Sequence, residues 1–493
     1  MFEAVELKQK VSKEEFKTEE PKIRTALLEA QRELATAPLS VVILVSGVEG
    51  AGKAEAVNLL LSWMDPRGVE VHAMWEPTDE ENERPPMWRF WRALPPKGRI
   101  GIFLGSWYTN PIIDRVFGRI DDAAFEGDLA RIVAFERMLA QEGTLVVKVW
   151  MHLSKAAQKE RLLELEADPL QSWRVTDLDW KFYEKVNRFR RFSEQALRTT
   201  GTGEAPWTLI GAQDRRHRNL TVAKTLLEAL KERLAAVRAA KPAAITPDRP
   251  KPKPVNVLNQ LDLAKRMPDE SYERQLLKLT GRINVLARRL REERRSLILV
   301  FEGPDAAGKG GAIRRLLSAI DARMYQVISV AAPTDEERAR PYLWRFWRHL
   351  PRLGRVTVYD RSWYGRVLVE RIEGFCAKDD WQRAYAEIND FERQLTDHGT
   401  LVRKFWLMTS PAEQLRRFKE RQTTPYKQYK LTEEDWRNRE KWDAYEAAAC
   451  EMIERTSTGA APWIVVPADD KNTARIEVLS TVARALKKEL GEE

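Results

Sequence analysis

Residues 296–320 read SLILVFEGPDAAGKGGAIRRLLSAI, and this stretch decides the fold. The apolar run at Leu297–Phe301 predicts a buried strand, and the residues after Lys309 predict an amphipathic helix. Between them, Gly303 and Gly308-Lys309 have the Gly-x4-Gly-Lys spacing of a phosphate-binding loop, or P-loop. A strand before the loop and a helix after it form the context that this motif requires.

The loop is suited to anions. Its glycines allow consecutive backbone N–H groups to turn toward one anion, the helix start adds partial positive charge, and Lys309 adds a full charge. The residues predicted to bind phosphate through the loop are Gly303, Ala306, Ala307, Gly308 and Gly310.

Magnesium ligands are expected elsewhere, because the usual Ser or Thr after the lysine is replaced by Gly310. Two carboxylates are placed for this role: Asp305 in the loop, and Asp360 at the end of the apolar run VTVYD. Arg361 is then placed to meet a transferring phosphoryl group. In the alternative interpretation, Asp305 only closes the turn and Asp360 caps the next segment.

The second half of the chain repeats the first at a spacing of 256 residues, the difference between Lys309 and Lys53. WRFWR at 88–92 likewise recurs at 344–348. A repeat of this length is a whole domain rather than a solenoid unit.

The copies are joined by residues 237–256, VRAAKPAAITPDRPKPKPVN, whose five prolines predict an extended linker. We therefore expect domains at 1–236 and 257–493. The clearest buried strands are predicted at Val41–Ser46, Leu297–Phe301, Val356–Tyr359 and Leu401–Leu407. Strands that alternate with helical patterns predict an α/β fold: two tandem three-layer αβα domains of the P-loop kinase type, each with a parallel sheet and a helical lid.

The two copies differ where chemistry requires particular residues. In the first copy, Asp305 is replaced by Glu49, Gly310-Gly311 by Ala54-Glu55, and Asp360-Arg361 by Leu104-Gly105. Leucine cannot bind a metal, glycine carries no cation, and Glu55 adds negative charge at the anion-binding helix start. We expect the second copy to be catalytic and the first to be a structural partner, packed on it in place of a second subunit.

A basic segment is the candidate lid. Residues 403–430 contain eight basic and two acidic side chains, whereas the matching residues 147–174 contain five and four. A long phosphate chain requires a series of cations. The ordinary interpretation of such a run, a solvated helix face, remains open.

Three segments, GPDAAGKGG, PTDEERARPYLWRFWRHLP and YDRSWYGRVLVERIEG, closely resemble the polyphosphate kinase 2 family. The resemblance covers both copies and nearly the whole chain. It implies phosphoryl transfer between inorganic polyphosphate and nucleotides with Mg²⁺, and two fused copies are similar to the class that makes ADP from AMP. By this resemblance the catalytic residues are Asp305, Lys309, Asp360 and Arg361, with Asp305 and Asp360 as metal ligands. The family's basic lid pattern corresponds to EQLRRFKERQTTPYKQYK, in which Arg417, Arg421 and Lys430 match. Together with Lys427 of the same basic run, they are the expected polyphosphate contacts.

Composition excludes several classes of protein. With 43% apolar and 32% charged residues, the chain is globular rather than disordered. No apolar run approaches the roughly 18–20 residues of a membrane span, and the opening MFEAVELKQKVSKEEF lacks a signal-peptide core, so we expect a cytoplasmic protein without a membrane partner. Two cysteines predict neither a disulfide framework nor a cysteine metal site.

The residues alone leave three functions open. The leading one is phosphoryl transfer from polyphosphate to AMP, giving ADP, with no nucleic acid as partner. The second is an ATP-dependent nucleoside-monophosphate kinase, with the lid closing over ATP. The third is a nucleic-acid-binding P-loop protein, because a net charge of +9 also suits a sugar-phosphate backbone.

Overall fold

The computed structural model describes residues 1–7, 9–240 and 245–491, and for Lys430 the backbone alone. Residues 241–244 of the expected linker therefore lie outside the described residues. Two compact units are present: Met1–Pro77 with Met87–Lys241 and Pro333–Trp344, and Thr78–Pro86 with Pro242–Ala332 and Arg345–Glu493. Each unit thus includes one short segment from the other half of the sequence. The boundaries 1–236 and 257–493 stay a prediction.

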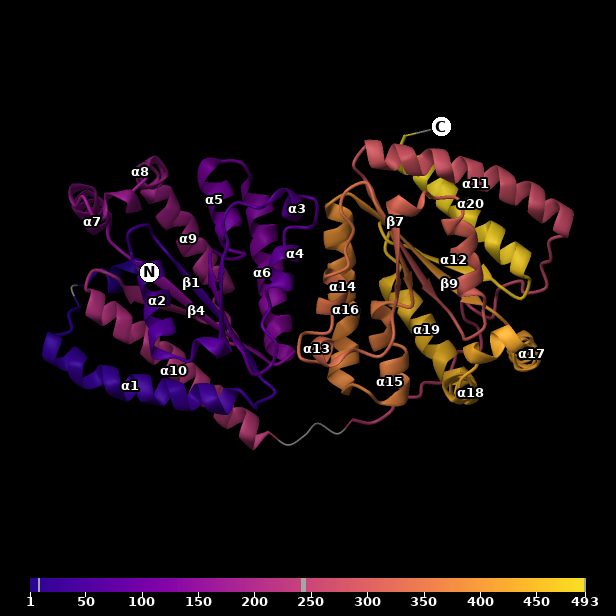
Figure 1. Ribbon diagram of the computed structural model, residues 1–493, viewed down its shortest axis with the longest axis horizontal. Coiled ribbons are helices and arrows are strands. Elements are labelled where there is room, and N and C mark those ends of the chain that lie inside the picture. Colours follow the sequence, from indigo (N-terminus) through magenta and orange to yellow (C-terminus); the bar gives the residue numbers. More distant parts are fainter. Residues whose placement is uncertain (8, 241–244, 492–493) are drawn as a thin grey trace. The chain divides into compact units, whose positions relative to one another are not determined.

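Each unit is a three-layer α/β fold with helices on both faces of a parallel sheet (Figure 1), which confirms the predicted fold class. The strand order is β2-β3-β1-β4-β5 in the first unit, and β7-β8-β6-β9-β10 repeats it in the second. The four predicted strands all lie within observed ones. The strands are β1 Ser40–Gly47, β2 Val69–Ala73, β3 Ile100–Leu104, β4 Thr144–His152, β5 Trp207–Gly211, β6 Ser296–Glu302, β7 Tyr325–Ser329, β8 Val356–Asp360, β9 Thr400–Met408 and β10 Trp463–Pro467.

Helices fill the connections between strands, as parallel strands require. In the first half of the chain they are α1 Lys13–Leu34, α2 Lys53–Trp63, α3 Asp79–Asn82, α4 Trp88–Arg92, α5 Thr109–Phe117, α6 Asp122–Gln141, α7 Lys155–Ala167, α8 Asp177–Glu184, α9 Val186–Thr200 and α10 Arg215–Ala239. In the second half they are α11 Asp269–Glu292, α12 Lys309–Leu317, α13 Asp335–Arg338, α14 Trp344–Trp347, α15 Val369–Glu373, α16 Lys378–Asp397, α17 Pro411–Thr423, α18 Glu433–Glu440, α19 Trp442–Thr456 and α20 Lys471–Glu489. None of the described helices is long and apolar enough to span a bilayer.

The two faces of the second sheet have different roles. Leu297, Leu299 and Phe301 of β6 point to one face, where they pack in a core with α11, α12 and α20. Alternate residues of a strand point to opposite faces. Glu302 at the end of β6 and Trp406 of β9 therefore face the other layer, which contains α16 and α19. The loops after the carboxyl ends of β6 and β8 join these layers at the edge where α/β proteins bind ligands.

In each unit, a buried ion pair joins a central strand of the sheet to a helix packed on it. In the second unit, Lys404 Nζ donates to Glu392 Oε2 at 2.6 Å, to Tyr364 Oη at 2.8 Å and to the Thr456 carbonyl at 2.7 Å. Both side chains of the pair are at most 1% exposed. Lys148 and Glu136 form the same pair in the first unit. Because the pair occurs in both copies, including the one without a complete transfer site, we assign it to stability rather than chemistry.

Glu392→Gln should destabilise the second unit by about 3–5 kcal/mol, because it leaves the Lys404 ammonium buried without its counter-charge. Replacing both members together, as Lys404→Met/Glu392→Leu, should recover most of that loss. Hydrogen–deuterium exchange of β9 amides measures the change locally, and Glu136→Gln should leave these amides unaffected. A loss below 1 kcal/mol would mean that the pair contributes little.

Candidate active site

In the P-loop of the second unit, the lysine side chain donates hydrogen bonds to backbone carbonyls of the loop itself. Gly303 has φ 140°, and a side chain there would meet the Leu407 carbonyl oxygen at 2.3 Å, so only glycine fits. Lys309 Nζ donates to the carbonyl oxygens of Gly303 at 2.6 Å and Pro304 at 3.2 Å. Gly308, with φ 108°, precedes the first residue of α12. The loop thus places the lysine charge and the helix N-terminus side by side.

Two non-glycine residues of the site have left-handed backbone conformations. Ala306 has φ 61° and Arg361 has φ 62°, an arrangement that costs free energy for residues with a Cβ atom. Their counterparts in the first copy are Gly50 and Gly105, with φ 78° and 81°, which adopt this conformation without that cost. The second copy therefore keeps the Arg361 side chain despite backbone strain, which indicates a functional role.

Asp305 is held at the centre of the site. Arg361 Nη2 donates to its Oδ1 at 2.9 Å, and Asn438 Nδ2 donates to its Oδ2 at 2.8 Å. Gln414 Nε2 donates to its backbone carbonyl at 3.0 Å. The structure therefore brings two of the predicted catalytic residues, Asp305 and Arg361, into direct contact. Asn438 and Gln414 complete the arrangement from α18 and α17.

Lys309, Asp305, Asp360 and Arg361 form one electrostatic group. Burial lowers the pKa of Lys309, while the carboxylates of Asp305 and Asp360 act to raise it. Burial also opposes ionisation of Asp305, but Lys309 and Arg361 hold the pKa of this carboxyl below its usual value. Asp305 is therefore a carboxylate at neutral pH, so the site has both anionic and cationic groups for a metal–phosphate complex.

The carboxylates suit a metal that is shared with substrate. Within the described residues, no group of three or more His, Cys, Asp or Glu side chains is arranged to hold a metal ion. Asp360 ends β8 opposite Phe301, and in the described part of the chain its carboxylate has neither a hydrogen bond nor an ion pair. Mg²⁺ binds through one or two carboxylates plus phosphates and water rather than in an all-protein cage. Asp305 and Asp360 fit that donor set.

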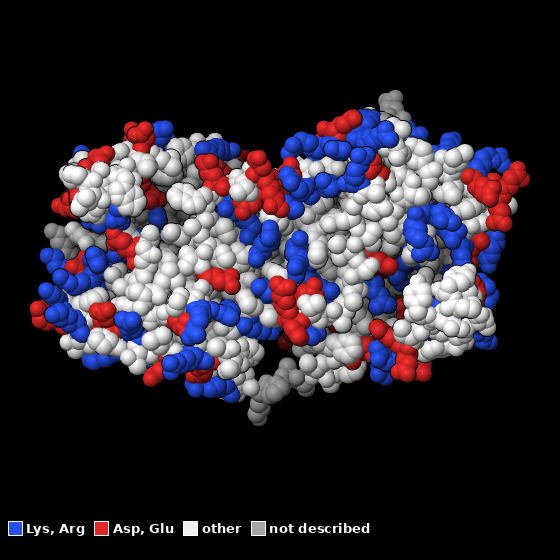
Figure 2. All heavy atoms as spheres, viewed as in Figure 1, with Lys and Arg blue, Asp and Glu red and all other residues white. Residues whose placement is uncertain are grey.

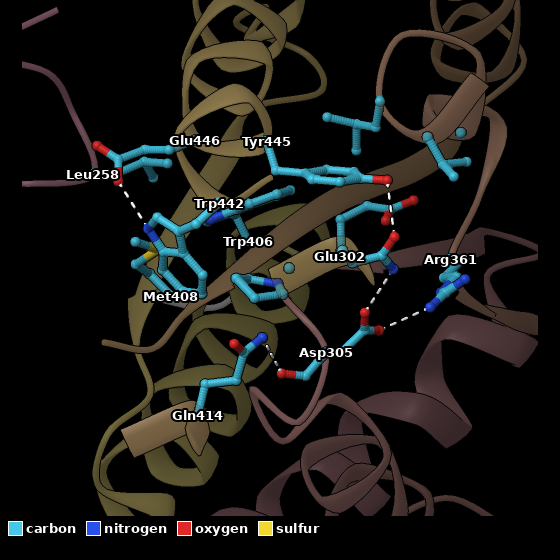
Figure 3. Close-up of a pocket in the computed structure, with 16 residues that line it drawn as sticks. Leu258, Glu302, Asp305, Arg361, Trp406, Met408, Gln414, Trp442, Tyr445 and Glu446 are labelled. Carbon is cyan, nitrogen blue, oxygen red and sulfur yellow. Dashed lines mark hydrogen bonds and ion pairs between the residues drawn. The ribbon is translucent and has the colours of Figure 1, made fainter. Parts of the chain in front are cut away.

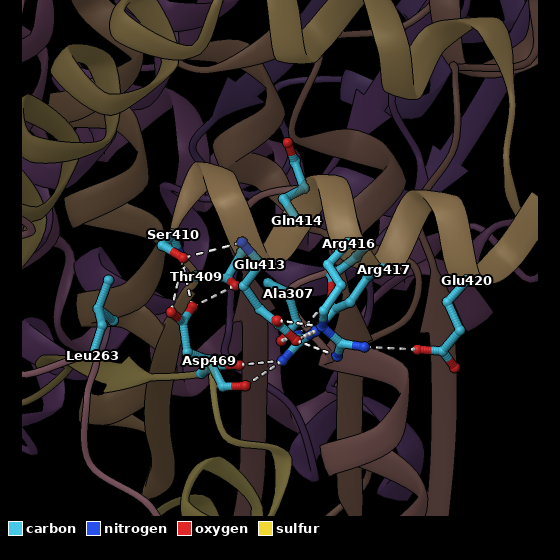
Figure 4. A network of polar contacts seen from close by, with 12 residues as sticks. Leu263, Ala307, Thr409, Ser410, Glu413, Gln414, Arg416, Arg417, Glu420 and Asp469 are labelled. Atoms are coloured by element: carbon cyan, nitrogen blue, oxygen red, sulfur yellow. Dashed lines mark hydrogen bonds and ion pairs between the residues drawn. The ribbon is translucent and has the colours of Figure 1, made fainter.

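The structure places Arg417 differently from the expectation that it contacts polyphosphate. Its side chain is 5% exposed, and the guanidinium is surrounded by acceptors (Figure 4). The acceptors are the backbone carbonyls of Ala306, Ala307, Ala468 and Asp469 and the carboxylate of Glu413, at 2.7 to 3.0 Å. Arg417 therefore fixes the P-loop to the α17 and β10 side of the domain. We assign it as a positioning residue.

The other lid residues lie farther along the segment. Arg421 is partly buried in the last turn of α17, and Lys427 pairs with Glu420 at 2.6 Å. The side chain of Lys430 lies outside the described residues. Arg421 and Lys427 therefore remain predicted polyphosphate contacts, with Arg421 on the helix and Lys427 on the turn after it.

Further cations that the sequence analysis missed lie near the start of α12 and near the lid. A side chain at Gly310 would lie 3.8 Å from Arg314 Nη1, and one at Gly311 would lie 3.7 Å from Arg475 Nη2. Burial, together with the neighbouring cations of the lid, lowers the pKa of Lys471, the first residue of α20. Figure 2 shows Lys and Arg side chains gathered over α12. Periodicity alone gives no signal for Arg475 and Lys471, because they come from a helix distant in sequence.

Arg417→Ala and Arg421→Ala should have different effects. Arg417→Ala leaves buried carbonyls of the P-loop unpaired, so we expect a loss of about 3–5 kcal/mol of stability and a lower kcat. Arg417→Lys should not restore either property, since it lacks the planar fork. Arg421→Ala should raise the KM for polyphosphate alone. Thermal unfolding and initial rates measure both effects, and a purely kinetic defect in Arg417→Ala would contradict its positioning role.

A pocket opens beside Asp305 and Arg361 on the α19 side of the sheet (Figure 3). Trp406 and Met408 of β9 line its floor, and Trp442 and Tyr445 of α19 line a wall. In the view of Figure 3, Trp406, Trp442 and Met408 lie toward one end of the pocket and Arg361 lies at the other. The site can therefore hold a ligand with an apolar part and a negatively charged part.

In the corresponding P-loop of the first unit, the charged side chains form ion pairs with other residues of the same unit. Lys53 Nζ contacts Glu49 Oε1 at 2.8 Å. Glu55 at the start of α2 accepts from Arg174 and Arg218, each at 2.8 Å. Although burial opposes it, these arginines lower the pKa of Glu55 to about 2. A carboxylate of the protein thus neutralises Arg174, the counterpart of Lys430, at the start of α2.

Comparison with known proteins agrees with this geometry. The family described as Polyphosphate kinase 2 (PPK2) matches residues 10–238 and again residues 266–493. The chain belongs to the polyphosphate kinase 2 family. Both copies therefore have the polyphosphate kinase 2 fold, although only the second has the full set of P-loop and strand-end residues.

Full-length relatives of this polyphosphate kinase 2 chain are known. It is 51% identical to the polyphosphate:AMP phosphotransferase of Pseudomonas aeruginosa over 99% of this chain and 98% of that one. It is 40% identical to the polyphosphate:AMP phosphotransferase of Acinetobacter johnsonii over 91% of each chain. A crystal structure of a polyphosphate kinase 2 from Pseudomonas aeruginosa PA01 superposes with a TM-score of 0.90 at 48% identity, over 100% of both chains.

Proposed function

We propose that the chain is a polyphosphate:AMP phosphotransferase, which transfers a phosphoryl group from inorganic polyphosphate to AMP and gives ADP. The observation that carries the proposal is the contact of Asp305 with Arg361 beside the P-loop lysine, in the second copy. The names of the full-length relatives support the same reaction. We place this activity in residues 257–493.

The chemistry requires positioning and charge neutralisation. A phosphate oxygen of AMP attacks the terminal phosphorus of polyphosphate in line, a new P–O bond forms, and the bond to the next phosphate breaks. The donor is left one phosphate shorter. Lys309 and Arg361 neutralise the charge of the transferring group, and the N–H groups at the start of α12 orient it. No strong general base is required, because the acceptor phosphate is already ionised.

A divalent metal, which we propose to be Mg²⁺, would be held by Asp305 and Asp360 together with the phosphates. When bound, it neutralises phosphate charge and orients the reacting groups. Arg361 and Asn438 hold Asp305 in place for this role, through 2.9 and 2.8 Å contacts to its two oxygens.

We propose that the first copy stabilises the second copy and does not itself catalyse phosphoryl transfer. Its strand-end residues are Leu104 and Gly105, and its Lys53 is already paired with Glu49. We propose that it replaces a second subunit as an internal pseudo-dimer partner. Deletion of residues 1–236 should then cause aggregation or homodimer formation, which size-exclusion chromatography measures.

Donor dependence tests the proposed reaction. AMP with long-chain polyphosphate and Mg²⁺, in the absence of ATP, should yield ADP. ADP formed from AMP and ATP but not from polyphosphate would instead identify a nucleoside-monophosphate kinase. Retention of oligonucleotides at physiological salt without any transfer would favour a nucleic-acid-binding protein.

A further inference from the structure

The pocket beside Asp305 is lined by aromatic side chains and is large enough for a small ligand. Its volume is about 100 Å³, several times the roughly 10–15 Å³ that one water molecule requires. Two tryptophans line it, Trp406 and Trp442. Trp406 is 4% exposed, and its Nε1 has no hydrogen-bond partner within the described ranges of the chain.

The first copy shows an occupant at the corresponding place. With the shift of 256 residues, Leu258 and Met408 correspond to Phe2 and His152. The Phe2 ring is fully buried and stacks on the His152 ring, with centroids 4.3 Å apart and planes within 4°. It also lies 5.9 Å from the ring of Trp150, the counterpart of Trp406. An aromatic ring supplied by the N-terminal segment therefore fills this part of the first unit.

In the second unit that ring stack is missing. Leu258 and Met408 are aliphatic and not flat, and both line the pocket together with Trp406 and Trp442. A heteroaromatic ring in the second copy would supply the stacking surface that Phe2 supplies in the first.

We infer that the pocket of Trp406, Met408, Trp442 and Leu258 binds the base of the acceptor nucleotide. This inference rests on the proposed function. The base lies at the end lined by Trp406 and Trp442, and the phosphate reaches Arg361 and Asp305 at the other end, where transfer occurs (Figure 3). The copy with Phe2 in this position has no room for a base, which agrees with its missing strand-end residues.

Trp442→Ala tests the assignment, because Trp442 is partly exposed and lies outside the core. Loss of one stacking partner should weaken AMP binding roughly 5- to 150-fold, seen both in the KM for AMP and in calorimetric titration with AMP. The KM for polyphosphate should remain unchanged. Trp442→Phe, which keeps a ring, should stay within a few fold of wild type. Ribose 5-phosphate, which has no base, should inhibit wild type much more weakly than AMP binds.

A second variant fills the pocket instead of emptying it. Leu258→Phe/Met408→His rebuilds the ring stack of the first copy, so the protein should fold and yet bind AMP weakly. Phe189→Ala, which changes the first-copy counterpart of Tyr445, should leave the KM for AMP unchanged. Unaltered AMP binding in Trp442→Ala and in the filled variant would overturn the inference, even if wild type makes ADP. Absence of ADP formation by wild type would instead overturn the proposed function.

Discussion

Lys309→Ala should lower the rate of ADP formation on the order of 10²-fold or more, whereas Lys53→Ala should leave kcat nearly unchanged. Lys309 lies between the P-loop carbonyls and the carboxylates of Asp305 and Asp360, where it can neutralise a transferring phosphoryl group. Lys53 has the same place in the first copy but is paired with Glu49. Losing its charge therefore removes a structural contact and not a catalytic one.

The two lysine variants are controls for each other, because each removes the same side chain from the same type of loop. Initial rates with saturating AMP and polyphosphate give the comparison, and thermal unfolding shows whether either loop is destabilised. Comparable losses of kcat in both variants would mean that the first copy also catalyses.

Asp305→Asn and Asp360→Asn should each reduce turnover by orders of magnitude. Gly310 provides no metal ligand, and an amide is a much weaker ligand for Mg²⁺ than a carboxylate. In Asp305→Asn the contact to Arg361 also loses its charge, since that contact joins Arg361 Nη2 to Asp305 Oδ1. Rates measured across a range of Mg²⁺ concentrations should show a higher requirement for the metal.

Glu49→Gln in the first copy is the matched control for Asp305→Asn, and its rate should equal that of wild type. Activity within a few fold of wild type at limiting Mg²⁺ in either aspartate variant would remove that residue from the metal site. The fold should persist in both, because neither side chain belongs to the apolar core.

The sequence predicted most of what depends on local pattern. The apolar runs at Leu297–Phe301 and Leu401–Leu407 gave the central strands, because fully buried parallel strands need continuous apolar residues. The 256-residue repeat predicted two domains of the same fold, and the two sheets have the same strand order. Gly303 and Gly308 were found because the P-loop requires left-handed backbone at fixed spacing, and both have positive φ.

Long-range contacts were not predictable in this way. Arg417 is part of a basic run, and its charge pattern is the same whether it points to solvent or into the P-loop; only the fold brings the Ala468 and Asp469 carbonyls to it. Asn438 reaches Asp305 across 133 residues of sequence. No local pattern in the sequence indicates that the ring of Phe2 stacks on the ring of His152. Side chains that meet only in the tertiary structure leave no periodic signal.

The central claim is that the second copy alone transfers phosphate, and one double variant tests it most directly. Asp360→Leu/Arg361→Gly gives the second copy the strand-end residues of the first. Since glycine relieves the left-handed strain at position 361, where φ is 62°, it offsets part of the loss of the Arg361 contact to Asp305, and the variant should still fold. ADP formation from AMP and polyphosphate should fall to background, while a cooperative thermal unfolding transition shows that the variant is folded. Substantial ADP formation by this folded variant would contradict the account.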